Sequence, residues 1–225
     1  MTFSLIGRCA ETGMLGVAIT TSSICVASRC PWARAGAGAV STQNVTDPTI
    51  GTKVLDLLAG GKSAAEALQA VLAASQYTEY RQVTVIDRQG RTAHHSGAKT
   101  LGTNAVAEGK DCLAAGNLLS NTDVPKAMAT SFTRHADLHL AERLLRALES
   151  GIVAGGEKGP VKSAGLLVVD KQIWPLVDLR VDWSEDDPVA GLRDLWERYQ
   201  PQMSDYVTRA LDPRSAPAYG VPGDP

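Results

Sequence analysis

The sequence predicts a mixed α+β fold, in which two antiparallel sheets are covered by helices as a four-layer α/β/β/α sandwich. Three observations predict it. Strands, two helices, strands, two helices, a strand hairpin and a helix follow one another along the chain. Short turns join neighbouring strands, which is typical of antiparallel pairing. The helices come in pairs, which is typical of layers that cover the faces of sheets. A two-domain α+β arrangement is the alternative.

The first half of the chain begins with a hairpin and then changes to a helical period. Strands are expected at 2–8, 15–20, 24–28 and 36–42, with a turn at 11–13 between the first two. Asp47 followed by Pro48 is typical of a helix start. Ser63 and Glu66 form a capping box that begins a second helix after the Gly60-Gly61 stop.

The second half repeats this order. Strands are expected at 82–87, 92–96, 112–115, 164–170 and 174–181, and helices at 124–134 and 137–150. Asp187 and Pro188 begin a last helix, which Pro201 interrupts and which resumes at 203–211. Beyond it the chain is rich in Pro, Gly and Ala. We therefore expect one domain over 1–211 and a tail with little structure over 212–225.

Composition and charge exclude several classes of protein. The chain has 225 residues, of which 44% are apolar, enough for a full core. Its net charge of −2 comes from 22 basic and 24 acidic residues and argues against nucleic-acid binding. Its apolar runs are far shorter than the ~20 residues of a membrane span, and the start lacks a secretory signal. We expect a cytoplasmic protein that binds neither nucleic acid nor membrane.

Cysteines and histidines do not suggest a metal or a cofactor. The cysteines have no zinc or redox spacing, and we expect reduced, mostly buried thiols at Cys9, Cys25, Cys30 and Cys112. His135 and His139 lie one helical turn apart, but no acidic or cysteine partner has metal-site spacing. We expect these two histidines on a solvated helix face, and a protein that needs no cofactor.

Thr2 is the residue that carries the functional hypothesis. Initiator methionine is generally removed before a small side chain such as threonine. Removal would give Thr2 a free α-amino group beside its own hydroxyl. The amine has an ordinary pKa of about 7.7–8.0, so it can accept the hydroxyl proton near neutral pH while the oxygen attacks a carbonyl. Thr2 would then be both nucleophile and base.

The chain resembles a family of bacterial proteins similar to N-terminal nucleophile (Ntn) hydrolases and catalogued as a domain of unknown function. The resemblance covers the whole chain. It is carried by residues 1–4 (MTFS), 31–36 (PWARAG), 38–44 (GAVSTQN), 80–82 (YRQ), 115–117 (AGN), 177–182 (VDLRVD) and 219–225 (YGVPGDP). It implies the Ntn type of α/β/β/α sandwich, with Thr2 as nucleophile and base.

The chain departs from the proteasome-type pattern, which places a lysine and an aspartate near the nucleophile. Ser22 and Ser23 stand where many relatives carry the lysine. The candidate replacements are Arg34 and, next to a strand, Arg81; the alternative for Arg34 is a surface charge at a strand end. No His has a spacing that would make either serine the nucleophile of a triad.

Amide side chains at strand ends are the candidate oxyanion donors. Asn117 follows Gly116 after a short strand, so its amide and a backbone N–H would face a substrate carbonyl. Gln43 and Asn44 end a strand just before a helix. For each of these residues the alternative is turn chemistry, because asparagine bonds its own backbone.

These residues together favour a hydrolase that cleaves an amide C–N bond of a small molecule through an acyl-Thr2 intermediate. The alternative is an inactive protein of the same fold that binds a small molecule or serves as an oligomeric scaffold. A hydrolase predicts a pocket at Thr2, whereas a binding protein predicts a closed strand start and a pocket elsewhere. A metal-dependent enzyme is a third hypothesis, and it lacks the required ligand cluster. We expect a homodimer from general base rates.

Overall fold

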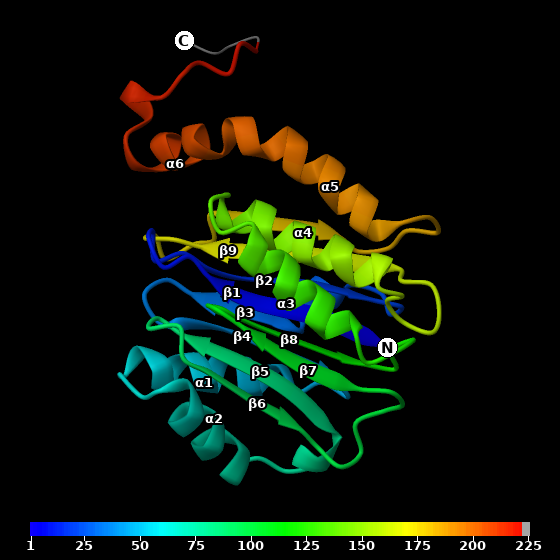
Figure 1. Cartoon of the computed structure of the whole chain (residues 1–225). Coiled ribbons are helices and arrows are strands. Elements are labelled where there is room, and N and C mark those ends of the chain that lie inside the picture. Colours follow the sequence, from blue (N-terminus) through cyan, green and yellow to red (C-terminus); the bar gives the residue numbers. More distant parts are fainter. Residues whose placement is uncertain (222–225) are drawn as a thin grey trace.

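Two antiparallel sheets form the centre of the computed structural model, which describes residues 1–221 (Figure 1). The six-stranded sheet has the order β10-β9-β2-β1-β8-β7, and the four-stranded sheet has the order β3-β4-β5-β6. The strands of the larger sheet are β1 (Thr2–Arg8), β2 (Leu15–Thr21), β7 (Ala105–Gly109), β8 (Cys112–Asn117), β9 (Ser163–Val169) and β10 (Val177–Val181). Those of the smaller sheet are β3 (Pro31–Arg34), β4 (Gly38–Asn44), β5 (Arg81–Asp87) and β6 (Thr92–Ser96).

Helices pack against both sheets. The helices are α1 (Pro48–Ala59), α2 (Ala64–Ala73), α3 (Val124–Arg134), α4 (Leu140–Val153), α5 (Pro188–Tyr199) and α6 (Met203–Leu211). α3 and α4 contact the larger sheet, and α5 contacts its edge strand β10 and the adjacent strand β9. α1 and α2 contact the smaller sheet, and β1, β2 and β8 contact strands of that sheet directly. The expected mixed α+β class with two antiparallel sheets is confirmed.

Alternation along β1 separates two environments. Phe3 and Leu5 belong to the apolar core beneath α3 and α4. Ile6 belongs to the core between the two sheets, and Ser4 bonds to residues of β4. Since side chains two positions apart share a face, Thr2 points with Ser4 and Ile6 into the space between the sheets. The first residue of the sheet is thereby placed at one end of that space.

Helix starts agree with the sequence. Asp47 and Asp187 accept hydrogen bonds from the first helical N–H groups, and each is followed by Pro. Ser63 and Glu66 form the expected reciprocal capping box. These caps satisfy N–H groups that a helix leaves free at its start.

Two expectations about elements are wrong, and two strands were not expected. Residues 24–28 are not a strand: Cys25 has a left-handed backbone (φ 54°), and Val26–Ser28 form a 3-10 turn. The third strand is β3, a short half-buried strand that was not expected. The fourth helix begins at Leu140 rather than at 137, because the His139 side chain accepts the N–H of Ala141 and caps it there. Strand β7 was also not expected, because it is short and only half-buried.

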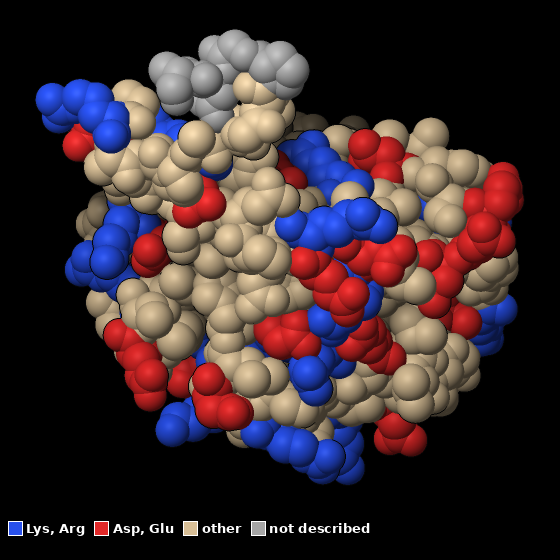
Figure 2. Space-filling view, turned by 90° about the horizontal axis from the view of Figure 1, so that it is seen from above, with Lys and Arg blue, Asp and Glu red and all other residues tan. Residues whose placement is uncertain are grey.

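The surface carries mixed charge. On the face seen in Figure 2, which includes the C-terminal part of the described chain, basic and acidic side chains are interspersed. Within the described residues, no helix combines the length and the apolar character that a membrane crossing needs. In the expected tail, Pro213–Ser215 form a short 3-10 helix. Residues 222–225, the end of that expected tail and of the 219–225 segment, lie outside the described residues.

We predict that Phe132→Ala lowers the free energy of unfolding by about 3–5 kcal/mol. Phe132 is fully buried in α3, and its ring lies where a Cβ on Gly7 of β1 would stand. The truncation therefore leaves a cavity between helix and sheet. Urea unfolding measures the change. The control Val153→Ala, at a side chain that is 89% exposed, should stay within about 0.5 kcal/mol. Equal effects of the two variants would contradict the packing described.

Candidate functional site

A buried polar network joins the two sheets at the end of the space where β1 begins. Its buried members come from four strands, and they are Ser4, Ser41, Gln43, Gln82 and Asn117. Ser96 of β6, which is exposed, accepts a hydrogen bond from Gln82. The Ser4 hydroxyl donates to Gln43 Oε1 over 2.8 Å. The Gln43 amide donates to Gln82 Oε1 over 2.8 Å and to the Ala115 carbonyl over 3.3 Å. β1 and β8 are thereby tied to β4 and β5.

Gln82 of β5 lies at the centre of this network. Its Oε1 accepts from Gln43 and also from Asn117 Nδ2, the latter over 3.1 Å. Its Nε2 donates to the Gly116 carbonyl and to the Ser96 hydroxyl, each over 3.2 Å. These four bonds fix which amide atoms donate and accept. Asn117 is fully buried, and its Oδ1 has no hydrogen-bond partner among residues 1–221. A free acceptor thus remains beside Thr2.

Thr2 lies between two strands and is 6% exposed. In the register of the sheet it stands opposite Thr21 of β2 on one side and Asn117 of β8 on the other. Its Oγ1 is 3.0 Å from the Thr21 hydroxyl oxygen and donates to the Met1 carbonyl over 2.6 Å. The Thr21 hydroxyl donates to the same carbonyl. Two hydroxyls therefore converge on the carbonyl oxygen of residue 1.

A buried carboxyl lies near this group. Glu157 is 7% exposed, and neither carboxyl oxygen has a well-formed hydrogen bond within the described chain. Burial raises the pKa of the Glu157 carboxyl to about 8, against the opposing effects of the Met1 α-amino group and of the Ser22 N–H and hydroxyl. The carboxyl and the α-amino group interact without a direct ion pair. Burial thus favours the protonated form of Glu157, whereas the nearby α-amino group favours its charged form.

Backbone hydrogen bonds hold Glu157 in this place. Leu119 and Glu157 form an isolated antiparallel bridge, and the Lys158 N–H donates to the Leu118 carbonyl over 3.1 Å. Leu118 itself has a left-handed backbone, with φ 51°. That conformation is costly for a branched side chain and lies at a bend directly after Asn117. The bend follows the end of β8, and the next residue, Leu119, pairs with Glu157.

The structure brings together some of the residues that the sequence singled out. Asn117 and Gln43 lie in the network beside Thr2. Ser22 follows β2 and interacts with Glu157. Ser23 is exposed, and its carbonyl accepts the Ser163 hydroxyl over 2.6 Å.

The other candidate residues form a surface ion pair or bond to backbone groups. Arg34 pairs with Asp56 over 2.8 Å on the surface, and β3 places it at the end away from Thr2. Asn44 has a left-handed backbone and bonds the Tyr80 carbonyl and the Leu101 N–H, which is turn chemistry. Arg81 donates to the Val45 carbonyl. The structure places none of these three in the Thr2 cluster.

Sequence reasoning missed Thr21, Gln82 and Glu157. Thr21 directly follows the expected strand 15–20 and is the last residue of β2. The alternation of side chains along that strand was the signal that could have identified it. Gln82 stands at the start of an expected strand, where a buried amide is unusual. Glu157 lies in a glycine-rich loop 155–160, and no pattern links that loop to residue 2.

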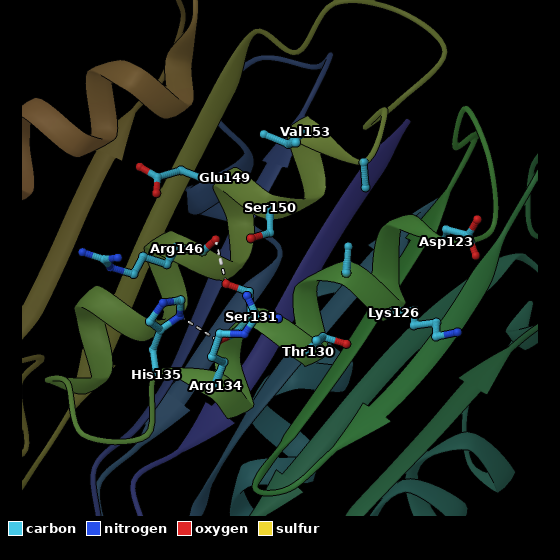
Figure 3. Close-up of a pocket in the computed structure, with 12 residues that line it drawn as sticks. Asp123, Lys126, Thr130, Ser131, Arg134, His135, Arg146, Glu149, Ser150 and Val153 are labelled. Carbon is cyan, nitrogen blue, oxygen red and sulfur yellow. Dashed lines mark hydrogen bonds between the residues drawn. The ribbon is translucent and has the colours of Figure 1, made fainter.

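A groove of about 690 Å³ lies between α3 and α4, and Thr2 is not among its lining residues (Figure 3). Its charged lining is mixed and consists of Lys126, Arg134, Arg146, Asp123 and Glu149. Arg146 pairs with Glu142 over 2.6 Å, whereas Lys126 and Arg134 form no ion pair within residues 1–221. The pocket that a hydrolase predicts at Thr2 is thus not this groove, and Met1 covers Thr2 in the structure.

The histidines do not share a solvated helix face as expected. His135 follows the last residue of α3, and its Nδ1 lies 2.8 Å from the Ser131 carbonyl. His139 caps α4 and stacks on Trp196, and burial lowers its pKa. Over residues 1–221 no three His, Cys, Asp or Glu side chains are grouped so that they would hold a metal ion.

Comparison with known proteins identifies the family. The model of the family of unknown function DUF1028 matches residues 2–192, so the chain belongs to this family. The crystal structure of protein SPO2555 from Silicibacter pomeroyi, described under the same family, is similar with a TM-score of 0.83 and 28% identity. That similarity covers 91% of this chain and 92% of the other.

Two structures of Anbu, the ancestral β-subunit, are more distant. The protein from Yersinia bercovieri has a TM-score of 0.44 and 11% identity, over 90% of this chain and 96% of that one. A Gly-1 mutant from Hyphomicrobium sp. strain MC1 has a TM-score of 0.41 and 12% identity, over 92% and 99%. No curated protein matches the chain. The family is therefore shown, and its activity has to be argued from the site.

We predict that Gln82→Leu destabilises the protein by about 1–3 kcal/mol for each buried group that it leaves unpaired. Asn117 Nδ2 loses its one acceptor among the described residues, and Gln43 Nε2 keeps only the longer bond to Ala115. Urea unfolding measures the loss. Gln69→Leu, at an exposed position of α2, should change stability by less than about 0.5 kcal/mol. A neutral Gln82→Leu would show that the network does not hold the sheets together.

We also predict that Glu157 makes stability fall as pH rises. Its pKa is about 8 in the folded chain and about 4.3 when unfolded. The folded state therefore holds the proton more tightly, and this stabilisation is present below pH ~4 and is lost as pH rises to ~8. The unfolding free energy of the wild type, relative to Glu157→Gln, should fall from pH 5 to pH 8. The surface variant Glu197→Gln should keep the wild-type slope, and a flat wild-type difference would contradict the burial of Glu157.

Proposed function

We propose that this protein is an Ntn-type hydrolase that cleaves an amide C–N bond, with Thr2 as its N-terminal nucleophile once Met1 is removed. In this proposal the two sheets and their helices form the four-layer α/β/β/α sandwich of the Ntn type. The small-molecule substrate, the homodimer and the cytoplasmic location remain predictions from the sequence.

The observation that carries the proposal is the convergence of two hydroxyls on one carbonyl. Thr2 Oγ1 lies 2.6 Å from the Met1 carbonyl oxygen, and the Thr21 hydroxyl donates to the same atom. A reacting carbonyl beside Thr2 would be in the same surroundings. A buried carboxyl and a free amide acceptor, from Glu157 and Asn117, complete these surroundings. Such unpaired buried groups are costly for stability alone, which supports a functional role.

The chemical steps follow from these groups. The Thr2 α-amine takes the proton of Oγ1 while this oxygen attacks the substrate carbonyl carbon. The Thr21 hydroxyl donates to the carbonyl oxygen as negative charge develops on it. The C–N bond then breaks, the leaving amine takes the proton from the α-ammonium, and the acyl group remains on Oγ1 as an ester. Water attacks this ester with the α-amine again as base, which releases the acid and restores Thr2.

The neighbours of Thr2 would hold the amine in position. Asn117 stands opposite Thr2 in the sheet and offers Oδ1 as an acceptor for an N–H donor. The network through Gln82 fixes the Asn117 side chain, so this acceptor is preorganised rather than free to rotate. In this proposal, these neighbours replace the lysine and the aspartate that proteasome-type proteins have near the nucleophile and that this chain does not have there.

A second candidate function is small-molecule binding without chemistry. The groove between α3 and α4 favours it, because Lys126 and Arg134 line this groove without ion-pair partners in the described chain (Figure 3). An anionic ligand would fit these charges. A ligand that binds there in a protein without turnover would favour this alternative over hydrolysis.

We predict that Thr2→Ala abolishes hydrolysis of amide substrates, whereas Thr2→Ser retains part of it. The alanine has no hydroxyl, while serine keeps both the nucleophile and the amine. A screen of amino-acid and ureido amides, read by release of amine, measures the rates after intact mass has shown that each protein begins at residue 2. Loss of a nucleophile typically costs several orders of magnitude in rate.

The control is Ser23→Ala, which removes an exposed hydroxyl but keeps the backbone N–H that bonds Thr21 Oγ1, so the rate should stay unchanged. Circular dichroism and urea unfolding must show that all three variants fold. Turnover that persists in a folded Thr2→Ala variant would contradict the proposal.

A further inference from the structure

We propose that the substrate of the Thr2 site is an aminoacyl amide with a free α-amino group, bound as the Met1 residue is bound in this structure. This inference rests on the proposed function and specifies its substrate class. Met1 is itself an aminoacyl group joined to the Thr2 nitrogen through an amide bond. Its three recognisable parts, the carbonyl, the α-amino group and the side chain, each meet a distinct part of the protein.

The carbonyl is held at the reacting position. Its oxygen accepts hydrogen bonds from the hydroxyls of Thr2 and Thr21. Because the Met1 carbonyl carbon is bonded to the Thr2 nitrogen, it lies within reach of the Thr2 hydroxyl. A substrate carbonyl would lie beside this place, with its oxygen facing the Thr21 hydroxyl and its carbon outside bonding distance of the Thr2 nitrogen. Departure of Met1 thus leaves a site that is shaped for a second aminoacyl carbonyl.

The α-amino group is matched by Glu157. This carboxyl is 7% exposed, lacks a well-formed hydrogen bond and interacts with the Met1 α-amino group. A buried carboxylate needs a positive partner or a proton, and an ammonium group supplies the partner. The Met1 amine leaves with Met1, so a substrate ammonium would take over its role. An N-acylated substrate has no such charge to offer.

The side chain end of Met1 meets Gly159. A Cβ on Gly159 would lie 3.1 Å from the Met1 Cε, so the glycine leaves room for the end of a long, unbranched side chain. Met1 and Gly159 are both half-buried, so this part of the site opens toward solvent. We therefore expect tolerance for long side chains, with a limit that Gly159 sets.

Hydrolysis of matched anilides tests the inference. The processed protein, shown by mass to begin at Thr2, is given L-methionine p-nitroanilide and its N-acetyl derivative. The free amine should give a kcat/KM at least about tenfold higher than the acetylated compound. Glu157→Gln should bring this ratio close to one, because a neutral amide no longer attracts the ammonium. Lys158→Gln, at the exposed neighbour, should leave the ratio unchanged.

A second variant tests the side-chain part independently. Gly159→Val should lower kcat/KM for the methionine anilide by about tenfold relative to glycine p-nitroanilide, because its methyl groups fill the space that the methionine side chain occupies. Glycine p-nitroanilide needs none of that space. An equal loss on both compounds would show that Gly159 does not limit the side chain.

The outcomes separate this inference from the proposed function. If the acetylated compound is cleaved as fast as the free amine and Glu157→Gln changes nothing, the substrate class is wrong. Cleavage that Thr2→Ala abolishes would still support the hydrolase in that case. If neither anilide is cleaved, the aminoacyl inference is overturned, and Thr2-dependent cleavage of other amides then decides the proposed function.

Discussion

The amide side chain of Gln82 is the contact on which the site depends. Its carbonyl oxygen accepts from Gln43 and Asn117, and its nitrogen donates to the Gly116 carbonyl, so β5 is bonded to β8 across the space between the sheets. Elsewhere this space is filled by an apolar cluster that includes Ile6 and Ile86. The amides of this polar end bond to one another, except that Asn117 Oδ1 has no partner among residues 1–221.

The bonds of Gln82 also hold the Asn117 amide, one of the polar groups that lie beside Thr2 at the start of β1. Thr2 is placed by ordinary sheet pairing between β2 and β8, which brings the Thr21 hydroxyl and the Asn117 amide beside it. The Leu118 bend then carries the chain toward the segment that holds Glu157. Thr2, the proposed nucleophile, thereby lies near the Thr21 hydroxyl, the Asn117 amide and the Glu157 carboxyl, which come from other parts of the sequence.

Much of the fold was predictable because it follows local rules. Asp47, Ser63 and Asp187 predicted helix starts because their side chains cap helices. Alternation of apolar and polar residues predicted the strands beside Thr2. The site was less predictable because its parts meet only through tertiary structure. Asn117 and Gln43 were found as strand-end amides, whereas Glu157 lies in a loop whose sequence gives no hint of its partner. Arg34 was a candidate to replace the missing lysine near Thr2, but it pairs with Asp56 at the surface.

The proposed hydrolysis requires Thr2 as a free N-terminal residue, since only then are the nucleophile and its base on one residue. The most direct measurement is the intact mass of the untagged protein purified from its own host. A chain that is lighter by one methionine residue, with Thr2 as its first residue, is the result that the proposed hydrolysis predicts. A mass that includes Met1 would leave the hydroxyl without its base, would contradict the hydrolase, and would direct attention to ligands of the groove between α3 and α4.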